Sequence, residues 1–188
     1  MSHPAAGGRT EPDRLFTISN LLSISRGILA IPFVLVMLSG SSSSTLWGVI
    51  IMVVAAFTDK LDGELARRLH QTTEWGKILD PVADKIAVAA VTLVLVKLQR
   101  ISPWFLIGIL ARDILILAGG WYLKSAKGIL LSSNETGKWA VSVIALTLLV
   151  SLLQAGSPWV EILMAASIGF MLVSVVQYSM RFVRAIRV

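Results

Sequence analysis

The sequence predicts an all-α integral membrane protein, a single bundle of six transmembrane helices. Of the 188 residues, 55% are hydrophobic and 15% are charged, whereas a soluble domain carries about a quarter charged residues. The mean hydropathy is +0.78, and six apolar segments approach the roughly 20 residues that a spanning helix needs. This composition argues against a soluble enzyme, a nucleic-acid-binding module and a disordered chain. Cysteine is absent, which excludes disulfides, thiol catalysis and cysteine-bound zinc.

The predicted helices follow one another with short polar connections. Residues 1–16 are expected to form a flexible cytoplasmic tail, and residues 17–188 are expected to form the membrane domain. The connections are clusters of turn-forming residues at 40–44, 102–103, 132–134 and 156–158. Between these clusters the six helices are expected at residues 21–38, 46–69, 78–96, 104–123, 139–153 and 159–180. All six tryptophans fall at or near segment ends, as an interfacial aromatic belt requires.

The distribution of Lys and Arg predicts the orientation of the bundle. With a cytoplasmic N-terminus, two cations lie on the outer side, Lys97 and Arg100. Eleven lie on the cytoplasmic side: Arg9, Arg14, Arg67, Arg68, Lys77, Lys124, Lys127, Lys138, Arg181, Arg184 and Arg187. Because cytoplasmic loops carry the excess of Lys and Arg, both termini are expected in the cytoplasm.

Four aspartates lie in or beside apolar helical runs. Asp59 and Asp62 are three residues apart, and Asp80 and Asp84 are four apart, so each pair projects from one helical face. Carboxylates inside a membrane are expensive without counter-charges. Hard divalent cations such as Mg²⁺ or Mn²⁺ supply that charge and prefer oxygen ligands. The alternative is structural pairing with nearby cations, namely Lys60, Arg67, Lys77 and Lys85.

The sequence around these aspartates resembles a family signature. It reads Asp59-Lys-Leu-Asp62-Gly-Glu-Leu-Ala-Arg67, and after eight residues Gly76-Lys-Ile-Leu-Asp80-Pro-Val-Ala-Asp84. This resembles the signature D-x-x-D-G-x-x-A-R, eight residues, G-x-x-x-D-x-x-x-D of the CDP-alcohol phosphotransferase family, with all eight fixed positions present. The resemblance implies a six-helix membrane enzyme that transfers a phosphatidyl group from CDP-diacylglycerol to an alcohol and releases CMP.

The resemblance also implies residue roles. Asp59, Asp62, Asp80 and Asp84 would hold two divalent cations, Mg²⁺ or Mn²⁺, and Asp84 would also be the general base. The positions matching the family's contacts to the CDP-linked lipid are Asn20, Gly63, Ala66, Arg67 and Thr73. Three cations are candidates for a phosphorylated acceptor, Arg26, Arg112 and Lys138, although Arg112 with Asp113 equally suits an internal ion pair.

The sequences at Asn20 to Arg26 and at Asp80 to Lys85 resemble phosphatidylglycerophosphate synthases, which favours sn-glycerol-3-phosphate as acceptor. The Arg112-Asp113 pair is closer to CDP-diacylglycerol-dependent cardiolipin synthases, so phosphatidylglycerol is the alternative acceptor. Expected partners are CDP-diacylglycerol, the acceptor and membrane lipids, with a homodimer left open and nucleic acid not expected. The expected location is the cell membrane, with the active site facing the cytoplasm. The non-enzyme alternative is a small ion transporter, because intramembrane carboxylates also mark ion paths.

Overall fold

The structure is a computed structural model that describes residues 18–69, 76–128 and 135–187, and the side chains of residues 24–58, 82–128 and 135–186. Every regular element in this part of the chain is an α-helix, which confirms the all-α prediction. In chain order the helices are α1 (Ile18–Leu38), α2 (Ser44–Leu69), α3 (Gly76–Lys97), α4 (Pro103–Lys127), α5 (Glu135–Leu152) and α6 (Ser157–Arg187).

Three of these helices, α4, α5 and α6, are long and apolar enough to cross a membrane. In the first two helices the described apolar stretches are shorter, at Ile24–Leu38 and Ser44–Thr58. Five tryptophans at or near helix ends are more than half exposed, with Trp104 at 78% and Trp121 at 74%. Large apolar side chains cover the outer surface of the bundle as well, which is the arrangement that a lipid environment favours.

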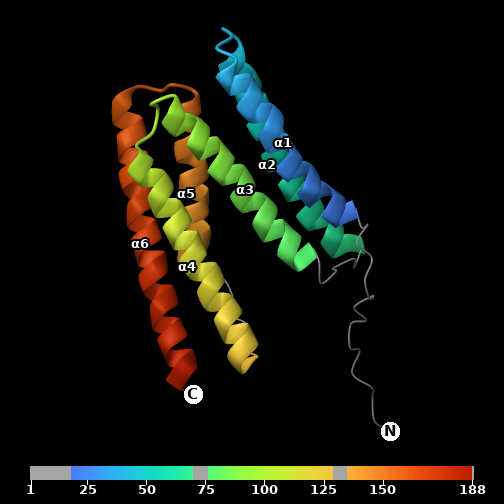
Figure 1. Cartoon of the computed structure of the whole chain (residues 1–188), viewed down its shortest axis with the longest axis vertical. Helices are drawn as coiled ribbons and strands as arrows, with labels where there is room; N and C mark the ends of the chain where they lie inside the picture. The colour runs from blue at the N-terminus through green and yellow to red at the C-terminus, as the bar shows by residue number, and fades with distance from the viewer. Residues whose placement is uncertain (1–17, 70–75, 129–134, 188) are drawn as a thin grey trace.

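The helices alternate in direction and form two groups (Figure 1). In the first group α1 packs against both α2 and α3, and in the second α6 packs against both α4 and α5. The third helix joins the groups, because it also contacts α4 and α5. Because the direction alternates from each helix to the next, the start of α1 and the end of α6 lie at the same end of the molecule (Figure 1).

The densest packing lies in the half of the bundle away from those two helix ends. There the core joins Phe33 and Met37 of α1 to Leu95 of α3, Phe105 of α4 and Leu152 of α5, each at most 2% exposed. A Cβ on Gly48 would lie 2.6 Å from the sulfur of Met37, so a larger residue where α2 crosses α1 would displace the Met37 side chain.

Polar bonds tie the helices together at the same end. The Arg100 guanidinium donates to the Leu152 carbonyl at 3.0 Å, and the Ser151 hydroxyl donates to the Arg100 carbonyl at 3.2 Å. This end therefore fixes the two groups to each other.

Candidate active site

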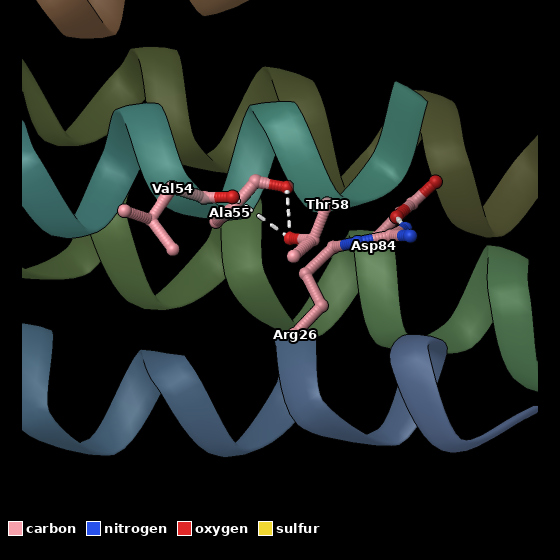
Figure 2. Close-up of polar contacts among 5 residues, drawn as sticks. All are labelled: Arg26, Val54, Ala55, Thr58 and Asp84. Carbon is pink, nitrogen blue, oxygen red and sulfur yellow. Dashed lines mark hydrogen bonds and ion pairs between the residues drawn. The ribbon is translucent and has the colours of Figure 1, made fainter. Parts of the chain in front are cut away.

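In the half of the bundle where α1 begins and α6 ends, the polar centre is an ion pair between α1 and α3. The Arg26 guanidinium donates through Nη1 to Oδ1 of Asp84, and Figure 2 shows the two side chains meeting between their helices. The Arg26 side chain is only 5% exposed, whereas that of Asp84 is 49% exposed. A buried permanent cation therefore holds a carboxylate whose other face is open to a reactant.

This pair lies at the edge of an apolar cavity of about 230 Å³ between α2 and α3, with α1 and α5 completing its wall. Arg26 and Asp84 are its two polar lining residues. The remaining lining is aliphatic and aromatic and includes five alanines, at positions 30, 55, 56, 87 and 145. A ligand whose polar group is held at the Asp84 carboxylate can therefore place its apolar part inside the cavity.

The other three aspartates of the predicted metal site, Asp59, Asp62 and Asp80, lie in the helices that flank this cavity, although their side chains are outside the described residues. Asp59 lies ten residues before the end of α2, and Asp84 lies eight residues after the start of α3. With a rise of about 1.5 Å per residue, these positions are about 15 Å and 12 Å from the neighbouring helix ends. The two positions are thus at a similar level of two antiparallel helices.

Helical periodicity relates the aspartate positions to the cavity wall. Position 59 follows the cavity-lining Ala55 by four residues, and position 62 follows it by seven, so all three share one face of α2. Position 80 precedes Asp84 by four residues on α3. On α2, next to position 59, the Thr58 hydroxyl donates to the carbonyls of Val54 and Ala55 of its own helix, at 2.8 and 2.9 Å (Figure 2).

The donor set at these positions suits a hard divalent cation. All four candidate groups are carboxylates, and the one whose side chain is described, Asp84, is half exposed at the cavity edge. Carboxylate oxygen is the ligand that Mg²⁺ and Mn²⁺ prefer. Among the described residues no cluster of three metal-binding side chains forms, because three of the four candidates fall outside that set.

The residues predicted to contact the CDP-linked lipid are placed only by their backbones. Asn20 is in the first turn of α1, and Gly63, Ala66 and Arg67 are in the last three turns of α2. Thr73 belongs to residues 70–75 and lies outside the described part of the chain.

The two remaining predicted cations lie in the second group of helices. Arg112 of α4 is 8% exposed, and it donates to Oδ1 of Asp113 at 3.0 Å and to the Gly137 carbonyl at 3.3 Å. Its Nε has no hydrogen-bond partner among the described residues. Lys138 of α5 has a side chain that is 63% exposed and contacts Glu135 at 2.7 Å. Arg112 is thus engaged inside the protein, whereas Lys138 is open to an incoming ligand.

One ion pair beside the candidate base was not expected from the sequence. Lys85, next to the candidate base, extends to α4 and contacts Oδ2 of Asp113 at 2.6 Å. From the sequence, Lys85 is only an alternative partner for the four clustered aspartates. The sequence could have indicated this pair, because Asp113 and Lys85 are both charged residues inside apolar runs. Such residues need partners of opposite charge.

Comparison with known proteins identifies the family of this chain. The sequence profile of the CDP-alcohol phosphatidyltransferase family matches residues 16–175. A Mycobacterium tuberculosis protein named provisionally as a cardiolipin synthase is 34% identical over 91% of this chain and 81% of its own length. A CMP-forming cardiolipin synthase of Streptomyces coelicolor is 32% identical over 84% of this chain and 74% of its own. The CDP-diacylglycerol–glycerol-3-phosphate 3-phosphatidyltransferase of Bacillus subtilis is 29% identical, over 87% of this chain and 94% of its own. The chain therefore belongs to the CDP-alcohol phosphatidyltransferase family.

Proposed function

We propose that this enzyme transfers a phosphatidyl group from CDP-diacylglycerol to sn-glycerol-3-phosphate, giving phosphatidylglycerophosphate and CMP. The observation that carries the proposal is the half-exposed Asp84 carboxylate at the edge of an apolar cavity, held by the buried Arg26. A carboxylate at the boundary between a polar opening and an apolar wall suits a substrate with a charged nucleotide head and a lipid body. The Bacillus subtilis relative, named for this reaction, matches this chain over nearly its whole length.

In the proposed reaction Asp84 is the general base. Its carboxylate takes the proton of the acceptor hydroxyl, and the hydroxyl oxygen forms a bond to the phosphorus that carries the diacylglycerol. The bond from that phosphorus to the oxygen bridging the two phosphates breaks, and its electron pair leaves with CMP. Arg26 holds the Asp84 carboxylate in place and keeps a positive charge beside it.

We further propose that Asp59, Asp62, Asp80 and Asp84 hold two divalent cations, Mg²⁺ or Mn²⁺. When bound, such ions neutralise the charge of a pyrophosphate and of its transition state. The proposed contacts of the CDP-linked lipid are Asn20, Gly63, Ala66, Arg67 and Thr73, by their match to the family signature. Support comes from the shared helix face of Ala55, Asp59 and Asp62 beside the cavity.

For the acceptor phosphate we propose Lys138, because its ammonium group is exposed and is paired with Glu135, which is itself exposed. Arg26 is a second cation near the base. Arg112 is buried and donates to Asp113 and Gly137, which supports the ion-pair interpretation over acceptor binding.

The proposed topology has six spans with both termini and the active site on the cytoplasmic side of the cell membrane. The eleven-to-two distribution of cations supports it. So does the position of Asp84 eight residues after the start of α3, because α3 begins in the half of the bundle where α1 begins and α6 ends (Figure 1).

A second candidate function is that of a cardiolipin synthase, in which phosphatidylglycerol is the acceptor. The names of the Mycobacterium and Streptomyces relatives favour it, as does the Arg112-Asp113 pair. The test is to supply purified enzyme with CDP-diacylglycerol and either acceptor, or inositol phosphate or serine, and to measure CMP release. Turnover with glycerol-3-phosphate and little with phosphatidylglycerol is the expected result. The reverse pattern overturns the proposed acceptor. If no CMP is released with any of these acceptors, the proposed reaction is contradicted.

A further inference from the structure

Two consecutive residues of α3 face opposite groups of helices. Asp84 contacts Arg26 of α1, whereas Lys85 contacts Asp113 of α4 at 2.6 Å. Successive residues of a helix differ by about 100° in direction, so neighbours in sequence meet different partners. The helix that carries the candidate base is therefore attached on one side to the first group and on the other side to the second.

The contact on the second side belongs to a network of three charged groups. Asp113 receives Lys85 on Oδ2 and Arg112 on Oδ1, at 2.6 and 3.0 Å, and Arg112 also donates to the Gly137 carbonyl of α5. The Asp113 side chain is 14% exposed and that of Arg112 is 9% exposed. Two cations share one carboxylate that is mostly shielded from solvent, so neither cation can be lost without changing the charge balance of the network.

Among the residues whose side chains the structure describes, the two groups have few other polar ties near this network. At the opposite end, Arg100 and Ser151 bond α5 to the chain that follows α3. In the half that contains Asp84, the cavity lies between α2 and α3. Among the described residues, the Lys85 to Asp113 contact is the one ion pair that joins the two groups.

From this geometry we propose that Lys85 and Asp113 are positioning residues. Their ion pair, braced by Arg112, sets the distance between the group that carries Asp84 and the group that carries Lys138. This inference rests on the proposed function, because it assigns the base to one group and the cation for the acceptor phosphate to the other. Its direct consequence is that the spacing of the two groups changes when the ion pair is removed, whatever the acceptor is.

The first test is a double-mutant cycle on turnover, with Lys85→Met, Asp113→Asn and the double variant. Misplacing reacting groups by about 1 Å costs up to about 10²-fold in rate, so each single variant should lose roughly 10- to 100-fold in kcat/KM. Because both remove the same contact, the double variant should lose no more than about threefold beyond the worse single variant. Lys85→Arg, which keeps the ion pair, should retain most activity. If Lys85 instead touched a substrate, its loss would multiply with that of Asp113, and that result overturns the proposal.

The second test measures the spacing itself and does not depend on catalysis. The native chain has no cysteine, so spin labels can be attached at cysteines replacing the exposed Phe57 of α2 and Leu117 of α4. Lys85→Met should shift or broaden the distance distribution between the labels. The control Lys97→Met removes an exposed lysine from the far end of the same helix and should leave the distribution unchanged. An unchanged distribution in folded Lys85→Met protein overturns the proposal. If the wild-type protein releases no CMP and Lys85→Met still shifts the distribution, the tie is supported and only the proposed function is contradicted.

Discussion

Replacing Asp84 by Asn is the most direct test of the proposed chemistry, since the change removes a proton acceptor and keeps the shape. Arg26 can still donate to the amide oxygen of the new side chain, so the α1 to α3 contact is weakened and not lost. The Asp84 side chain is 49% exposed, whereas that of Arg26 is 5% exposed, so the pair lies between a solvent-exposed pair, which contributes about 0–1 kcal/mol to stability, and a buried pair, whose loss of one partner costs about 3–5 kcal/mol. Because the Asn side chain still accepts a hydrogen bond from Arg26, the variant should fold, with a free energy of unfolding lower by no more than about 3 kcal/mol.

The effect on turnover should be much larger. A positioned general base contributes roughly 10²- to 10⁴-fold to the rate. We expect kcat to fall by at least about 10²-fold, which corresponds to about 2.7 kcal/mol in activation free energy. Affinity for CDP-diacylglycerol should change less, because Asp59, Asp62 and Asp80 remain.

The assay is CMP release by purified enzyme in lipid vesicles, with kcat and KM measured for both substrates. A matched control is Glu161→Gln, which makes the same change of carboxylate to amide at an exposed position near the start of α6, at the other end of the bundle. That control should keep wild-type turnover. Near-normal turnover of the Asp84→Asn enzyme would refute the assignment of the base.

Three further predictions follow from the same site. Activity should vanish with a metal chelator and return with Mg²⁺ or Mn²⁺, and full activity in excess chelator would contradict the carboxylate metal site. A cysteine at Ser42, exposed between α1 and α2, should react with an impermeant thiol reagent outside intact cells, while one at Ser125, exposed near the end of α4, should not; the opposite result would invert the topology. Lys138→Ala should raise the KM for glycerol-3-phosphate roughly 10- to 100-fold, as expected for about 1.5–3 kcal/mol from a charged hydrogen bond. Lys124→Ala, also an exposed lysine, serves as its control, and equal KM values for the two variants would exclude Lys138 from the acceptor site.

The helices themselves could be predicted from hydropathy, and so could the last residues of α1 and α2, at 38 and 69, but the ends of α4 and α6 could not. The sixth helix continues to Arg187, seven residues past the apolar segment, because no glycine or proline interrupts its basic end. The fourth helix passes its apolar segment by four residues and stops at Gly128, which adopts a left-handed φ of 66° and donates to the Lys124 carbonyl. Hydropathy locates the part of a helix in the apolar layer, whereas backbone capping decides where the helix ends.

The partners of the charged groups required the packed structure. A signature spacing identifies the four aspartates, because it depends only on positions within two helices. The contact between Arg26 and Asp84 joins residues 58 positions apart and depends on how α1 lies against α3. Lys85 had four nearby aspartates as candidate partners in the sequence, yet it contacts Asp113, because α3 turns that side of its surface toward α4.

This division between two groups of helices has a consequence for specificity. The candidate base lies on α3 beside α1, whereas Lys138, the proposed cation for the acceptor phosphate, lies on α5. Every acceptor must lose its hydroxyl proton, so the loss of Asp84 should lower turnover with all acceptors alike. Only an acceptor with its own phosphate group near α5 should depend on Lys138. Chemistry and acceptor choice are then carried by different helices, so substitutions on α5 can change the acceptor while α3 and its carboxylates stay the same.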